Sequence, residues 1–75
     1  MNSDFVVDQA IHLAKRAQNE SKGNLKTSVI RAFELIFSRK PRTEELNASL
    51  KIAKDRGLEI VCRALMNSNE FAFLP

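Results

Sequence analysis

The sequence predicts an all-α fold, a small compact bundle of four helices. Apolar residues recur at steps of three and four positions along most of the chain, as on one face of a helix. No stretch shows the period-two alternation of a half-buried strand. Turn-forming residues separate the apolar stripes, so the 75 residues form one domain, 1–75, in which helices adjacent in sequence pack on one another.

The first helix is predicted to begin at Ser3 or Asp4, since either side chain can cap free backbone N–H groups, and to run to about Asn19. A run of turn formers follows, in which Gly23 can take a positive φ. The expected buried face comprises Val6, Ala10, Leu13 and Ala17, widened by Val7, Ile11 and Ala14.

The second helix has the longest apolar stripe, more than three turns, and Asn24 is its expected cap. It should end near Ser38 or Arg39, because Pro41 disfavours the α conformation of Lys40. The stripe consists of Leu25, Val29, Ala32, Phe33, Ile36 and Phe37.

Thr43 is the expected cap of the third helix, where Glu44 and Glu45 complement the helix dipole, and Gly57 should end it as a left-handed stop or a bend. Its predicted buried face is Leu46, Leu50 and Ala53, with Ile52 at the edge.

The fourth helix is expected to stop at Asn67-Ser68-Asn69, whose side chains compete for backbone groups. A bundle of three helices and a short C-terminal turn is the alternative. Its predicted buried residues are Leu58, Val61, Cys62 and Leu65, and Phe71, Phe73 and Leu74 are expected to fold back as a hydrophobic plug.

Two strings resemble a known family. The first runs from Arg31-Ala32-Phe33 through Arg39-Lys40-Pro41-Arg42-Thr43 to Glu44-Glu45-Leu46, and the second ends in Asn67-Ser68-Asn69-Glu70-Phe71. In that order they resemble the C-terminal part of a planctomycete-specific domain of unknown function, over about residues 29–73. Ser38 stands where that family has a turn glycine. The resemblance implies the end of a large exported protein, often one that also carries cytochrome-c-like modules, and it implies no activity.

Composition excludes several classes of site. Cys62 is the only cysteine, so no internal disulfide forms, and with His12 it falls short of the four ligands of structural zinc. No cofactor or metal is therefore expected. The N-terminus has no basic region or long apolar run of a signal peptide, and no stretch approaches the roughly 18 apolar residues of a membrane span. We expect a cytoplasmic chain, or export as part of a longer parent.

The net charge is +3, and residues 1–24 contribute none of it. The densest basic cluster, in the turn between the second and third helices, could clamp phosphates or an acidic protein face, but we favour a solvated turn whose cations neutralise the end of the preceding helix. We call the following residues the basic patch: Arg39, Lys40, Arg42, Lys51 and Lys54.

No catalytic arrangement is predicted. His12 falls on the polar side of the first helix, and Cys62 falls on a buried face where a thiol is a core residue rather than a nucleophile. Phe33 and Phe37 belong to the core stripe rather than to a base-stacking platform. Residues 67–70 are interpreted as helix termination and capping, with a metal or hydrogen-bonding site as the alternative.

These observations predict a non-catalytic helical module that docks a protein partner or associates with itself. The expected apolar contact surface comprises Ile30, Leu35, Met66, Phe73 and Leu74, which do not all fit inside so small a core. The alternative is a nucleic-acid-binding domain, similar to a helix–turn–helix, that uses the basic turn at residues 39–42. Neither a membrane nor a small-molecule substrate is expected.

Overall fold

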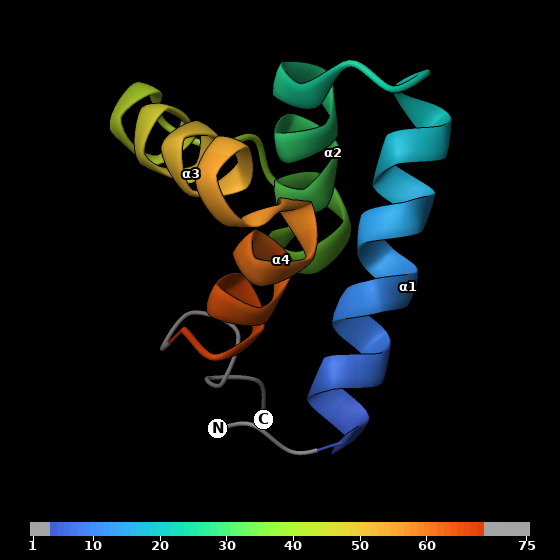
Figure 1. Ribbon diagram of the computed structural model, residues 1–75. Helices are drawn as coiled ribbons and strands as arrows, with labels where there is room; N and C mark the ends of the chain where they lie inside the picture. The colour runs from blue at the N-terminus through green and yellow to red at the C-terminus, as the bar shows by residue number, and fades with distance from the viewer. Residues whose placement is uncertain (1–3, 69–75) are drawn as a thin grey trace.

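Four α-helices make up the computed structural model, which describes residues 4–68 (Figure 1). They are α1 (Asp4–Glu20), α2 (Leu25–Phe37), α3 (Thr43–Arg56) and α4 (Leu58–Met66). No strand occurs in this part of the chain, so the predicted all-α class is confirmed. The predicted plug at residues 71–74 lies outside the described residues.

The helices α2 and α4 form the middle of the bundle, and each contacts the three other helices. By contrast, α1 and α3 lie on opposite sides of the bundle and do not touch within residues 4–68 (Figure 1). The shortest helix, α4, therefore joins the two outer helices.

Small and branched side chains build a core that all four helices share. Phe33, Val29, Val61 and Cys62 are all 1% exposed or less, and alanines of α1 and α2 let the helix backbones approach closely. The ring of Phe37 meets that of Phe33 edge to face, with centroids 5.8 Å apart. Phe33 is thus a core residue, as predicted.

The connection between α1 and α2 follows the sequence prediction. Gly23 has φ 80°, and its N–H donates to the carbonyl of Gln18 over 2.9 Å, which ends α1. Asn24 caps α2, because its side-chain oxygen accepts a hydrogen bond from the N–H of Thr27 at 2.9 Å.

The end of α2 is set by Ser38, which takes a left-handed conformation with φ 60° and donates its N–H to the carbonyl of Glu34. The prediction that Thr43 caps α3 is wrong: Thr43 is the first helical residue, and the extended Arg42 precedes the helix. The carboxylate of Glu45 reaches back and accepts the N–H of Arg42 at 2.8 Å, which makes a hydroxyl cap unnecessary.

A single residue, Gly57, separates α3 from α4. Its φ of 101° and ψ of 156° lie in a region that is essentially restricted to glycine, and its N–H donates to the carbonyl of Ala53. The bend that the sequence predicted at this position is confirmed.

Burial differs from the prediction in the last turn of α4. Met66 is 6% exposed and belongs to the core, whereas Leu65 is half-buried. The assignment of Met66 to the contact surface is therefore wrong. Because α4 packs against three helices, its buried face is wider than one stripe and includes the position one turn after Cys62.

In α3, the structure also buries a residue that the apolar pattern omits. Ser49 is 8% exposed and Ala53 6%, while Leu46 and Leu50 pack half-buried against the edge of the core. The edge position predicted for Ile52 is confirmed, since 38% of this residue is exposed.

Candidate functional site

Arg39 is the member of the basic patch that the structure places in a structural role. Its Nη1 and Nη2 donate to the two carboxylate oxygens of Glu45 over 2.8 and 2.9 Å. Its guanidinium carbon also lies 5.7 Å from the ring centre of Phe33 and 5.4 Å from that of Phe37. Arg39 thus fastens the end of α2 to the first turn of α3 and is not open for a ligand.

These contacts also fix the charge of Glu45. The hydrogen bonds from Arg39, and then that from the N–H of Arg42, lower the pKa of the Glu45 carboxyl to about 2. Glu45 is consequently an anion through the neutral range, and it cancels the charge of Arg39.

The rest of the basic patch is exposed, namely Lys40, Arg42, Lys51 and Lys54. Six of the twelve basic residues and three of the nine acidic ones fall within 38–57, so this stretch carries the whole net charge of +3. With Asp55, Lys51 and Lys54 line an open hollow of about 390 Å³ on α3. This hollow is lined by charged side chains and their aliphatic stems, all from α3.

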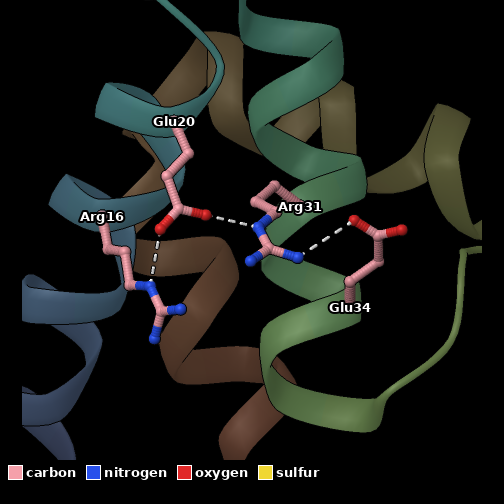
Figure 2. Close-up of polar contacts among 4 residues, drawn as sticks. All are labelled: Arg16, Glu20, Arg31 and Glu34. Atoms are coloured by element: carbon pink, nitrogen blue, oxygen red, sulfur yellow. Dashed lines mark hydrogen bonds and ion pairs between the residues drawn. The ribbon is translucent and has the colours of Figure 1, made fainter.

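A second charged group joins α1 to α2 (Figure 2). The carboxylate of Glu20 accepts hydrogen bonds from Arg16 at 2.8 Å and Arg31 at 2.6 Å, and Arg31 also meets Glu34 at 3.5 Å. The hydrogen bond from Arg16, and next that from Arg31, lowers the pKa of Glu20. The network joins two helices. Because its two arginines and two glutamates balance, it carries no net charge for a ligand.

The two side chains that were considered for catalysis lie in different environments. Cys62 is fully buried, and burial, assisted by the charge of Glu59, raises the pKa of its thiol to about 12. His12 is exposed on α1. Between residues 4 and 68, no cluster of His, Cys, Asp and Glu side chains is arranged to hold a metal ion.

The residues after α4 end the helix. The N–H of Asn67 donates to the carbonyl of Arg63 over 3.0 Å, and the hydroxyl of Ser68 donates to the carbonyl of Leu65 over 2.7 Å. The side-chain bond of Ser68 supports the capping interpretation, and the backbone bond of Asn67 closes the last turn of the helix. Asn69 and Glu70 lie outside the described residues.

The structure does not gather the predicted apolar contact surface. Ile30 and Leu35 are half-buried, and Leu35 packs against the core. Met66 is buried, and Phe73 and Leu74 lie outside the described residues. Because their helical positions are five residues apart, Ile30 and Leu35 occupy opposite flanks of α2.

A different feature is the best candidate site, a hollow of about 350 Å³ between α1 and the joint of α3 with α4. We call it the α1–α4 hollow. Apolar side chains share its lining about equally with charged or amide side chains. It is lined from α1 by Ile11, Ala14, Lys15 and Gln18, and from the joint by Arg56, Gly57, Leu58, Glu59 and Ile60.

Unlike the hollow on α3, this hollow is lined by residues of three helices. Lys15 and Arg56 are both exposed, and neither forms an ion pair among the described residues, so they face a single acidic lining residue, Glu59. No side chain caps the first turn of α4, because Gly57 stands at the cap position. The α1–α4 hollow therefore combines an apolar floor with a basic rim.

No sequence pattern predicts this site, because its residues come from two segments about forty positions apart. The one hint in the sequence was the pair Val7 and Ile11, because these residues make the apolar face of the first helix wider than a single neighbouring helix covers.

No family model matches the chain, and neither a curated protein nor a solved structure matches it. Within residues 4–68, no helix combines the length and the apolar character needed to cross a membrane.

Proposed function

We propose that this chain is a non-catalytic helical module that docks a protein partner in the α1–α4 hollow. The observation that carries the proposal is the composition of that hollow: apolar residues from two helices line it, and beside them Lys15 and Arg56 have no ion-pair partner among the described residues. Protein interfaces typically have an apolar centre and a polar, accessible border. The resemblance of residues 29–73 to the planctomycete-specific domain supports a place at the end of a larger protein.

The absence of catalysis is part of this proposal. The buried thiol of Cys62 stays protonated well above neutral pH, and the exposed His12 lines neither of the two hollows described above. These two environments support a binding role over an enzymatic one.

The test is site-specific photo-crosslinking in the cells that produce the chain. A photoreactive phenylalanine analogue at Ile60, inside the hollow, should give adducts with one defined protein, identified by mass spectrometry. The same analogue at Lys51, on the exposed side of α3, is the matched control and should not give that adduct. Equal adducts from both positions, or none from Ile60, would refute the proposal.

Nucleic-acid binding is the second candidate function, and one observation favours it: residues 38–57 carry the whole positive excess. Its weakness is that Arg39 is already engaged by Glu45. If it is correct, affinity for duplex DNA falls steeply with salt and drops further in Lys40→Ala/Arg42→Ala. An electrophoretic shift assay that shows no complex at low salt disposes of this candidate.

A further inference from the structure

We infer that the occupant of the α1–α4 hollow is an acidic amphipathic helix of the partner protein. The inference rests on the proposed function and names the chemistry that the site selects. Three features of the described residues support it: the direction of the two helices, the spacing of their apolar side chains and the unpaired charges at the rim.

The first feature is the antiparallel course of α1 and α4, which lie side by side (Figure 1). The beginning of α4 meets the second half of α1, because Leu58 and Ile60 line the same hollow as Ala14 and Gln18. From the hollow, α4 therefore continues toward the beginning of α1.

The second feature is an apolar strip that follows this course. Val7 lies one turn before Ile11 on the same side of α1 and is half-buried, and Ala64 lies one turn after Ile60 on α4 and is exposed. Because the helices are antiparallel, both residues lie beyond the lining of the hollow, toward the beginning of α1. Apolar positions one turn apart on two neighbouring helices match side chains at i, i+3, i+4 and i+7 of a third helix.

The third feature is the rim, which decides the charge of that helix. Lys15 of α1 and Arg56 of α3 have no ion-pair partner among the described residues. Carboxylates beside the apolar face of an incoming helix pair with these cations, and the uncapped start of α4 adds partial positive charge. A basic helix of the same apolar pattern is repelled. A nucleic acid matches the cations but leaves the apolar floor uncovered.

The experiment is an NMR titration of the full ¹⁵N-labelled chain with each of two synthetic peptides. Binding is measured from the changes in the amide chemical shifts of the chain. Both are 14-residue peptides with leucines at i, i+3, i+4 and i+7, and they differ only in carrying glutamates or lysines on the flanks. The glutamate peptide should shift the amides of Ile11, Gln18 and Ile60, and it should bind about tenfold more tightly than the lysine peptide.

A pair of matched double variants isolates the rim. Lys15→Glu/Arg56→Glu should reverse the preference between the peptides. Lys51→Glu/Lys54→Glu makes the same change in net charge on the exposed side of α3 and should preserve the preference. All four residues are exposed, and the amide spectrum of each free variant checks its fold.

Two outcomes would overturn the inference while leaving docking in the hollow intact. Equal binding of both peptides, lost in Ile60→Ser, would show that the hollow selects apolar side chains without regard to charge. Shifts of the hollow amides with protein concentration alone would identify a second copy of this chain as the occupant. If neither peptide shifts these amides and Ile60 gives no crosslink, the proposed function fails as well.

Discussion

Arg39 and Glu45 form a two-pronged ion pair across the turn between α2 and α3, with N–O distances of 2.8 and 2.9 Å. The planar guanidinium also packs against Phe33 and Phe37, so one side chain links the core, the turn and the first turn of α3. The densest basic cluster in the sequence thus contains a residue that stabilises the fold.

Removal of the Arg39 side chain should destabilise the bundle. Arg39→Ala is expected to lower the free energy of unfolding by about 1–2 kcal/mol, because it removes a partly buried ion pair and two contacts between a cation and aromatic rings. Urea denaturation measures the change. Arg16→Ala, which breaks the exposed pair with Glu20, is the control and should lower the free energy of unfolding clearly less. Equal losses in both variants would contradict the assignment.

The same pair makes stability depend on pH in the acidic range. Because the pKa of Glu45 falls from 4.5 to about 2 on folding, the folded state binds fewer protons than the unfolded state between these values. The stabilisation is fully present above pH 4.5 and is lost as the pH falls toward 2. Thermal unfolding from pH 7 to pH 2 should show a steeper loss for the native chain than for Glu45→Gln. Parallel curves would contradict this prediction.

Ser38 is expected to be a suboptimal residue at the end of α2. It has φ 60°, a conformation that a side chain disfavours and glycine takes freely. Ser38→Gly should therefore raise the free energy of unfolding by about 0.5–1 kcal/mol in urea denaturation. The left-handed Lys22, with φ 53°, offers a parallel test, since Lys22→Gly should act in the same direction. A loss of stability in Ser38→Gly would contradict the backbone argument.

Gly57 should show the opposite behaviour. No atom lies within 4 Å of a Cβ built at this position, so the cost of Gly57→Ala comes from the backbone conformation alone. We expect a loss of about 1–3 kcal/mol in urea denaturation. Gly23→Ala, also at positive φ and also in open space, should cost less, because φ 80° is closer to the left-handed region that other residues enter. No loss in Gly57→Ala would contradict the assigned bend.

The reactivity of Cys62 measures how often the native bundle unfolds enough to expose its core. Its thiol is fully buried, and its pKa of about 12 keeps it protonated at pH 8. A disulfide reagent should therefore react with the native chain at least about a hundredfold more slowly than with the chain in urea. A second thiol introduced by Ala64→Cys on the exposed side of α4 is the control and should react at once. Fast labelling of Cys62 in the native chain would contradict its burial.

Local signals predicted much of the fold. Asn24, Gly23 and Gly57 act through their own backbone and side-chain chemistry, so their roles follow from the sequence. The burial of Met66 in place of Leu65 depends on how many helices surround α4, which no periodicity reveals.

The candidate site was less accessible to sequence reasoning. The basic turn was visible, but the sequence did not show that Arg39 pairs with Glu45, because that contact needs the chain to reverse between α2 and α3. The α1–α4 hollow needs both the order of the helices in space and the bend at Gly57. Such features arise from tertiary packing.

The central position of α4 has a consequence for biosynthesis. Because α4 is synthesised after α1, α2 and α3 and packs against all three, the core around Val29 and Phe33 is complete only once Met66 has emerged from the exit tunnel. Folding of these four helices thus waits for α4, and a nascent chain stalled before Leu58 exposes apolar core residues to chaperones.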